Sequence, residues 1–284
     1  MATRLQVPKT YKLAIGGAFP RSESGRTFDV VDADGSFVAN ASKASRKDVR
    51  DAVVAARSAQ PGWSGATAYN RGQVLYRVAE LLDGRREQFA DEIVRLTGVP
   101  RRSARTQVTS AIDMWVWYAG WSDKFAQVSG AANPVAGPYF NISVPEPTGV
   151  VAVIAPQDDA LAGLVAAIAP VIVSGNTVVV VPNTRWPLPA ITLAEVLATS
   201  DVPGGVVNVL TGDVEELTPV LAGHLDVNAI DLGGVADRDT TDWETAAAEN
   251  VKRVVRTPPT QDADGPARIL AFCETKTVWH PKGW

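Results

Sequence analysis

Few side chains in this chain of 284 residues have the type and spacing that chemistry requires. Cys273 is the single cysteine. A catalytic thiol would need a depressed pKa and a nearby base, so a lone strand cysteine is more typical of a packed apolar side chain. The paired carboxylates Asp158 and Asp159 could act as an acid and a base, or could cap the helix expected to follow them. Gly233-Gly234 follows a strand and could approach a phosphate, but it lacks the full glycine-rich fingerprint.

The second half of the chain contains the elements that must position these residues. Apolar strands are expected at 150–154, 177–181, 206–210, 229–232 and 252–255, with helices at 161–173, 188–199, 215–222 and 241–250. Near-continuous Val and Ile strands that alternate with helices are typical of a parallel sheet covered on both faces. We therefore predict an α/β fold with a doubly wound, Rossmann-like sheet of about five strands. In such sheets ligands bind at the carboxyl ends of the strands.

The first half is predicted to form a helical layer after short strands and turns over 11–40. Ser45 and Asp48 have the spacing of a capping pair, and Pro61-Gly62 should end the helix that follows them. Further amphipathic helices are expected around 74–82, 89–96 and 106–124. Residues 126–148 then change character, because Gly, Pro and Asn flank the extended run Tyr139–Val144. That pattern predicts a hairpin arm outside the helical layer, and a last strand is expected over Arg268–Trp279.

The composition excludes several classes of protein. Apolar residues are 46% of the chain, charged residues are 20% and the net charge is −4, which are ordinary globular values without the basic patch that nucleic acid requires. The N-terminus has no apolar signal region, and the longest apolar stretch, 161–173, is too short to cross a bilayer. We therefore predict a cytoplasmic protein without membrane contact. With one cysteine and two histidines, His224 and His280, neither a disulfide nor a cysteine- or histidine-rich metal site is expected.

Segments spread over nearly the whole chain resemble the aldehyde dehydrogenase superfamily, and they occur in the family's order. They are YAGWSDK at 118–124, EPTGVVAVI at 146–154, GNTVV at 175–179, PGGVVNVLTG at 203–212, AENVKRV at 248–254 and ETKTVWHP at 274–281. The resemblance implies a Rossmann-like NAD-binding domain over 1–125 and 149–257. It also implies an oligomerisation arm over 126–148 and 267–284. The segment 258–266 would be a linker that takes the place of the family's catalytic domain, which carries the cysteine nucleophile.

The functional positions that the resemblance assigns have changed in this sequence. Asp158 stands where the family has the asparagine that stabilises the oxyanion, so repulsion replaces a hydrogen-bond donor. Thr257 stands at the general-base glutamate. The cofactor positions are altered too: Val181 and Thr184 at the ribose clamp, Val214 in the phosphate loop and Val235 at a strand end. The resemblance therefore implies no catalytic residue, no NAD and no other cofactor.

These changes predict a pseudoenzyme that assembles with a full-length, active, NAD(P)-dependent aldehyde dehydrogenase to stabilise, localise or regulate it. The arm would bind this partner by strand addition, and the face that normally packs on the catalytic domain would be bare. The expected interface residues are Tyr139, Phe140, Ile142, Val144, Ile269, Leu270, Phe272, Val278 and Trp279. One alternative is a homo-oligomeric sensor that binds a nucleotide or metabolite without dehydrogenase activity. Another is an enzyme of altered chemistry that uses Asp158 or Asp159.

Overall fold

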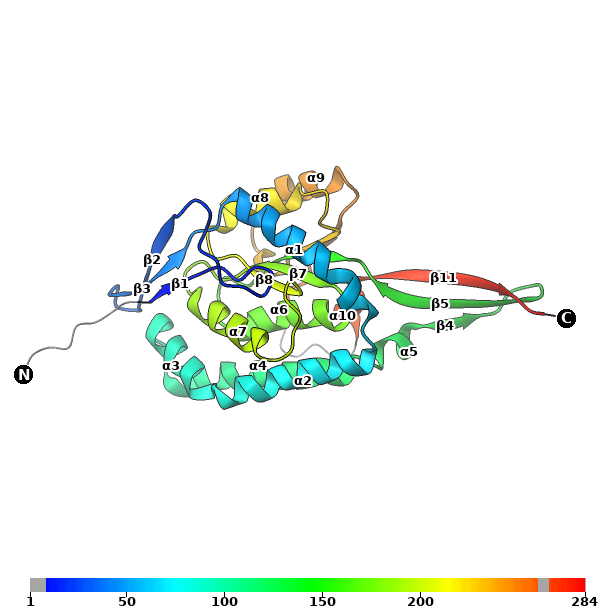
Figure 1. Cartoon of the computed structure of the whole chain (residues 1–284), viewed down its shortest axis with the longest axis horizontal. Coiled ribbons are helices and arrows are strands. Elements are labelled where there is room, and N and C mark those ends of the chain that lie inside the picture. The colour runs from blue at the N-terminus through cyan, green and yellow to red at the C-terminus, as the bar shows by residue number, and fades with distance from the viewer. Residues whose placement is uncertain (1–8, 260–265, 284) are drawn as a thin grey trace, which may run out of the picture.

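A five-stranded parallel sheet forms the centre of the chain. The computed structural model describes residues 9–259 and 266–283 (Figure 1). The strands lie in the order β10-β9-β6-β7-β8, and each neighbouring pair is parallel. Their bounds are β6 Val150–Ile154, β7 Thr177–Val181, β8 Val207–Val209, β9 Ala229–Asp231 and β10 Arg253–Val255. This confirms the predicted α/β sheet, and the carboxyl ends of these strands lie along one edge.

Helices cover both faces of the sheet. They are α1 Arg46–Gly65, α2 Ala68–Gly84, α3 Arg86–Thr97, α4 Arg101–Trp121, α6 Ala162–Val173, α7 Leu188–Ala198, α8 Val214–Ala222 and α9 Thr241–Ala248. Successive side chains of a strand point to opposite faces, so Val151 and Val153 of β6 join one apolar cluster and Val150 and Ile154 join another. The first cluster packs against α2, α3, α4, α6 and α7, and the second against α1, α8 and α9 (Figure 1).

The helical layer follows a small sheet of β1 Thr10–Tyr11, β2 Thr27–Val31 and β3 Phe37–Ser42. The predicted capping pair is confirmed, because Ser45 and Asp48 exchange side-chain to backbone hydrogen bonds at the start of α1. The prediction that Pro61 ends this helix is wrong, since α1 continues to Gly65. Trp63, in the last turn, is buried and donates its indole hydrogen to the carbonyl oxygen of Ile172 at 2.8 Å. Tertiary packing therefore holds the turn that the proline weakens.

The predicted arm is a separate three-stranded antiparallel sheet that projects away from the body (Figure 1). After the short helix α5 Phe125–Ser129 come β4 Ala131–Asn133 and β5 Tyr139–Pro147, and the tail supplies β11 Cys273–Pro281. The strand order is β11-β5-β4, so β11 and β4 are its edge strands. The tail and residues 131–147, which are far apart in the sequence, thus build one element.

The last strand starts later than the sequence predicts. Ala267–Leu270 form a short helix, α10, and β11 begins only at Cys273. Ile269 and Phe272 are completely buried in the cluster that packs on α6, so local helix formation and burial override their strand propensity. Of the predicted linker 258–266, residues 260–265 lie outside the described part of the chain. Across the described residues, every helix is too short or too polar to span a membrane.

Candidate functional site

The start of α6 is capped by a carboxylate of the chain itself. Asp159 accepts hydrogen bonds from the backbone nitrogens of Leu161 at 2.8 Å and Gly163 at 2.7 Å, and burial raises the pKa of its carboxyl group. The neighbouring Asp158, which the resemblance places at the oxyanion position, is exposed to solvent. The two carboxylates therefore have different environments. Of the two, Asp159 is the one that caps the helix.

The carboxyl ends of β6 and β7 are joined by side-chain amides. Gln157 donates to the carbonyl oxygen of Ala155 at 2.8 Å and accepts from the backbone nitrogen of Thr184 at 2.9 Å. Asn183 is buried, and its side-chain oxygen accepts from the backbone nitrogens of Arg185 and Trp186, both at 2.9 Å. Val181, the other ribose-clamp position, is completely buried at the end of β7. The region where the resemblance places the ribose clamp thus holds neutral groups that bond to one another.

The start of α8 is also capped from within. Asp213 accepts from the backbone nitrogen of Glu215 at 2.9 Å, and Val214 is buried. Glu216 pairs with Arg26 at 2.7 Å and with Lys43 at 2.9 Å, and hydrogen bonds from these two cations lower the pKa of its carboxyl group. The N-cap and the first turn of this helix therefore carry three carboxylates, and Glu215 in turn pairs with Arg238 at 2.8 Å.

The Gly233-Gly234 turn after β9 is filled by protein atoms. A β-carbon at Gly234 would lie 2.3 Å from the carbonyl oxygen of Ile154, and one at Gly233 would lie 2.2 Å from that of Thr257. Asp231 accepts from the backbone nitrogen of Gly233 at 2.9 Å, and Val235 is buried. Glycine is therefore needed here for close packing of the chain on itself, which accounts for the pair without a phosphate.

The described residues provide no assembled catalytic group at this edge. Cys273 lies at the base of the arm, where burial raises the pKa of its thiol to about 11 and its sulfur donates to the carbonyl oxygen of Ile269 at 3.5 Å. Thr257 is exposed after β10. No cluster of three or more potential metal ligands occurs among the residues that the structure describes. The arrangement therefore presents neither an activated nucleophile nor a base beside it.

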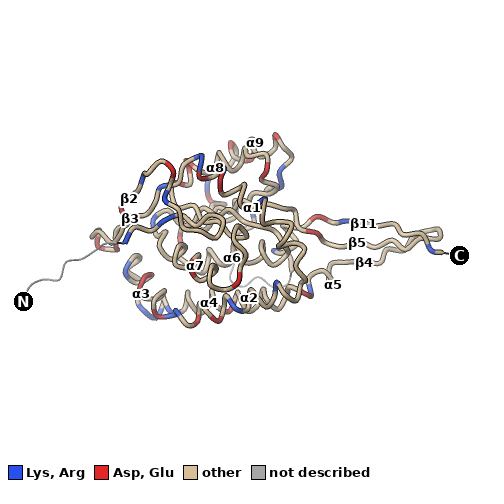
Figure 2. Tube along the Cα trace, viewed as in Figure 1, with Lys and Arg blue, Asp and Glu red and all other residues tan. Residues whose placement is uncertain are grey.

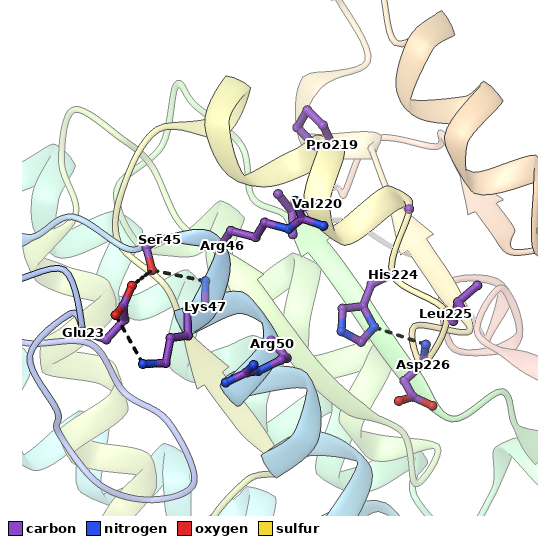
Figure 3. A pocket seen from close by; sticks show the side chains of 11 residues that line it. Glu23, Ser45, Arg46, Lys47, Arg50, Pro219, Val220, His224, Leu225 and Asp226 are labelled. Carbon is purple, nitrogen blue, oxygen red and sulfur yellow. Dashed lines mark hydrogen bonds and ion pairs between the residues drawn. The ribbon is translucent and has the colours of Figure 1, made fainter.

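A groove of about 1020 Å³, which the sequence does not predict, lies between α1 and the end of α8 (Figure 3). Arg46, Lys47 and Arg50 line it from α1, and the loop at His224 lines it from the other side. His224 accepts from the backbone nitrogen of Asp226 at 3.2 Å, and burial lowers the pKa of its imidazole. The sequence feature that could have indicated this groove is the group of three cations near the start of a helix, where the helix dipole disfavours positive charge.

One edge of the arm has open backbone groups. Thr148 donates its backbone hydrogen to Phe272 at 3.1 Å and Lys282 donates its own to Pro138 at 2.7 Å, so even-numbered residues of β11 bond to β5. The odd-numbered Thr275, Thr277 and Trp279 consequently direct their N–H and C=O groups away from β5. Among the described residues no strand pairs with this edge.

The two faces of the arm differ in polarity. One carries a hydrogen-bonded row in which Asn133 donates to Asn141 at 2.6 Å and Ser143 bonds to Thr277 at 2.8 Å. Tyr139 and Trp279 pack edge to face on that side, with ring centroids 5.9 Å apart. The other face carries exposed apolar side chains, and Figure 2 shows few charges along the middle of the arm. Those side chains are Phe140, Ile142, Val144 and Val278.

Three of the nine predicted interface residues are in the wrong place. Ile269 and Phe272 are 0% exposed and Leu270 is partly buried, because α10 folds them onto the body of the same chain. The other six lie exposed on the arm: Tyr139, Phe140, Ile142, Val144, Val278 and Trp279. The face that the resemblance pairs with a catalytic domain is formed by the loops after β6, β9 and β10. In the described loops after β6, β9 and β10 the exposed side chains are small or polar, and they include Asp158, Asp237, Arg238, Asp239, Arg256 and Thr257.

This combination of a doubly wound parallel sheet with a projecting β-arm defines a Rossmann-like α/β protein. A sequence model of the aldehyde dehydrogenase family matches residues 19–257, and the chain belongs to that family. It is 34% identical over 258 residues to cytosolic 10-formyltetrahydrofolate dehydrogenase of Mus musculus. The matched region covers 88% of this chain and 28% of that protein. The human protein of the same name is 33% identical, covering 86% and 28%.

The fold agrees with solved aldehyde dehydrogenase structures. The NAD⁺ complex of the aldehyde dehydrogenase from Bacillus cereus has a TM-score of 0.80 at 27% identity, covering 87% of this chain and 50% of that one. The NAD-dependent aldehyde dehydrogenase from Sinorhizobium meliloti also has a TM-score of 0.80, at 30% identity, covering 88% and 50%. The chain therefore spans about half the length of these structures and about a quarter of the curated relatives.

Proposed function

We propose that this chain is a non-catalytic subunit that binds a full-length, active, NAD(P)-dependent aldehyde dehydrogenase and stabilises, localises or regulates it. The observation that carries the proposal is the open edge of β11, where Thr275, Thr277 and Trp279 direct backbone groups outward beside exposed apolar side chains. The curated relatives are named cytosolic, and a cytoplasmic location for this chain is part of the proposal.

The absence of catalysis is supported by the state of the single thiol and by the residues at the family's oxyanion-stabilising and general-base positions. The pKa of Cys273 is raised to about 11, so the thiolate required for attack is scarce at neutral pH. Asp158 brings a negative charge to the position where a developing oxyanion needs a hydrogen-bond donor. Thr257 has no titratable group to act as a base near neutral pH. Covalent aldehyde oxidation requires each of these roles to be filled.

The absence of a bound dinucleotide is supported by the helix and turn starts at the carboxyl edge of the sheet. A pyrophosphate is normally bound by free backbone N–H groups at such a start. Here Asp159, Asp213 and Asp231 already accept the N–H groups of α6, α8 and the turn after β9. A cofactor would have to displace these carboxylates and would experience their charge, so we propose that no NAD or other cofactor is held.

Binding of a partner is supported by the chemistry of the arm. An open strand edge beside apolar side chains is a template for pairing with another sheet, and natural proteins normally protect such edges. Pro281 closes the edge at its end, and prolines at 145 and 147 restrict pairing on the opposite side of β5. The surface available for strand addition is therefore the segment from Thr275 to Trp279.

The test is a native pull-down with mass spectrometry, comparing wild type with T277P and T277V. Because the N–H of Thr277 points away from β5, T277P removes an outward donor and leaves the backbone bonds between β5 and β11 in place, and both variants lose the hydroxyl contact with Ser143. T277V keeps the donor and serves as the matched control. We expect wild type and T277V to capture a full-length aldehyde dehydrogenase and T277P to lose it. Elution of the native wild-type protein alone, as a stable monomer or homodimer, would contradict the proposal.

The groove between α1 and α8 favours a second candidate, a homo-oligomeric sensor of a nucleotide or another anionic metabolite. Its α1 wall carries Arg46, Lys47 and Arg50, of which Lys47 pairs with Glu23 at 3.4 Å and Arg50 with Asp51 at 3.1 Å. Calorimetric titration with NAD and NADP, on wild type and R46E, separates the two candidates. Saturable heat in the wild type that R46E abolishes would favour the sensor. Altered chemistry at Asp158 or Asp159 is less well supported, because Asp159 is used as a helix cap.

A further inference from the structure

Arg268 and Asp231 form a buried ion pair between the base of the arm and the central sheet. Arg268 lies in α10 and is 8% exposed, and Asp231, the last residue of β9, is completely buried. One guanidinium nitrogen, Nη2, bonds to Oδ2 of Asp231, and the guanidinium lies over the ring of Phe272 at 5.2 Å. Burial raises the pKa of Asp231 to about 6, and the adjacent Arg268 opposes the rise.

The same guanidinium contacts the chain on both sides of the segment 258–266. Its second terminal nitrogen, Nη1, donates to the carbonyl oxygen of Thr257 at 2.8 Å. Thr257 is the second residue after β10, whereas Arg268 is the second residue of α10. The side chain of Arg268 therefore connects three places: α10, where it lies, the residue Thr257 just after β10, and the end of β9.

The residues that follow Arg268 are fixed by further polar contacts. The carbonyl oxygen of Phe272 accepts from the backbone nitrogen of Thr148 at 3.1 Å, from its hydroxyl at 2.8 Å and from the side chain of Asn176 at 2.8 Å. Arg253 of β10 donates to the carbonyl oxygens of Ala271 at 3.1 Å and Cys273 at 2.6 Å. Every contact in this set lies at the base of β5 and β11, so they set the position from which the arm projects.

A buried ion pair is an inefficient way to stabilise a core, because desolvation offsets most of the attraction. Nε of Arg268 is buried without a hydrogen-bond partner among the described residues, which adds to that cost. A buried ion pair is better explained as a contact that favours one conformation of the chain over alternative conformations. The fork of Arg268 supplies that specification, since its two terminal nitrogens require Thr257 and Asp231 to lie at fixed positions.

We propose that Arg268 is a clasp: by holding Thr257 and Asp231 together it fixes where the chain returns to the sheet and thereby the direction of the arm. The fixed arm is then presented to its partner in one orientation, which reduces the conformational freedom lost on binding. The part of the inference that concerns the partner rests on the proposed function, and the part that concerns the arm does not.

The experiment is hydrogen exchange on the full chain for wild type, R268K and the charge-free double variant D231L/R268M. R268K keeps the charge but cannot bond to both acceptors in the geometry of a guanidinium fork. We expect the hydrogen-bonded amides of Thr148, Phe272, Glu274 and Lys276 to exchange about tenfold faster in R268K, with β6 and β7 unchanged. D231L/R268M should retain core protection and show the same loss at the base of the arm. R105M, which removes an exposed ion pair with Glu87 away from the arm, is the matched control.

Two results would overturn the clasp. One is exchange in R268K that equals wild type or that rises uniformly over the whole chain, which is the signature of a purely stabilising pair. The other is full arm protection in D231L/R268M. Capture of the full-length aldehyde dehydrogenase is measured on the same samples, and R268K should capture less of it than R105M does. If wild type captures none, the proposed function fails while the exchange data still decide the clasp.

Discussion

The carboxyl edge of the sheet and the arm differ in whether their backbone polar groups have partners within the chain. At the edge, the helix and turn starts are closed by Asp159, Asp213 and Asp231, and the glycine turn is packed against backbone. Along the arm, the outward groups of β11 have no partner among the described residues, and apolar side chains are exposed. A surface adapted to hold a ligand keeps its donors free, and one adapted to meet another chain keeps a strand edge free. The difference teaches that the backbone donors at the carboxyl edge are used within the chain, whereas those along β11 are available to another chain.

The largest expected effect is at the junction of the two regions. Arg268→Met leaves Asp231 as an uncompensated buried carboxylate, so we expect the free energy of unfolding to fall by about 3–5 kcal/mol. Urea denaturation monitored by circular dichroism measures it. A loss in the free energy of unfolding below about 1 kcal/mol would mean that solvent reaches the Arg268–Asp231 ion pair. In that case no buried ion pair would join the carboxyl edge to the arm.

The reactivity of Cys273 tests whether the single thiol belongs to a packed region. Its raised pKa leaves little thiolate at pH 8 and its side chain is buried. We expect labelling by iodoacetamide at pH 8 to be at least about 100-fold slower in the folded chain than in urea. Mass spectrometry of timed samples gives the two rates. Rapid labelling of the folded protein would instead indicate an accessible thiolate and would reopen a chemical role.

A smaller effect separates the two adjacent carboxylates of the edge. Asp159→Ala removes the cap of α6, and the expected loss in the free energy of unfolding is about 1–2 kcal/mol. The matched control is Asp158→Ala, whose exposed side chain should change stability by less than about 0.5 kcal/mol. The two variants are compared by urea denaturation under identical conditions. Equal losses would mean that the edge is not closed by Asp159 in the way described.

The smallest effect on stability is expected on the arm. Phe140→Ser replaces an exposed apolar ring, so the free energy of unfolding of the isolated chain should change by less than about 0.5 kcal/mol. The same variant should capture less of the full-length aldehyde dehydrogenase, because the apolar face loses its largest side chain. Denaturation and pull-down on one preparation check both statements. A large loss of stability would show that this face is part of the core of the isolated chain.

The central sheet could be predicted from the sequence because its strands are continuous apolar runs. Val150–Ile154 and Thr177–Val181 are buried along their whole length, so their bounds follow from the apolar pattern alone. The arm could be located because Gly, Pro and Asn flank an extended run there, whereas the neighbouring segments have helical spacing of apolar residues.

The remaining features depend on contacts that a linear pattern does not contain. Pro61 stays in its helix because Trp63 is anchored to a residue far away in the sequence. Arg268 and Asp231 are separated by a helix, a strand and the segment 258–266, so neither residue signals the other. The segment at Ile269 is apolar enough for a strand, and its burial beneath α6 is what makes it a short helix.

The most direct test of the account is aldehyde-dependent production of NADH by the purified, isolated chain, with a panel of aliphatic and aromatic aldehydes. The account predicts a rate no higher than that of the buffer blank, and the same rate for Cys273→Ser. NADH production above the blank that Cys273→Ser abolishes would contradict the central claim that this chain is a non-catalytic subunit.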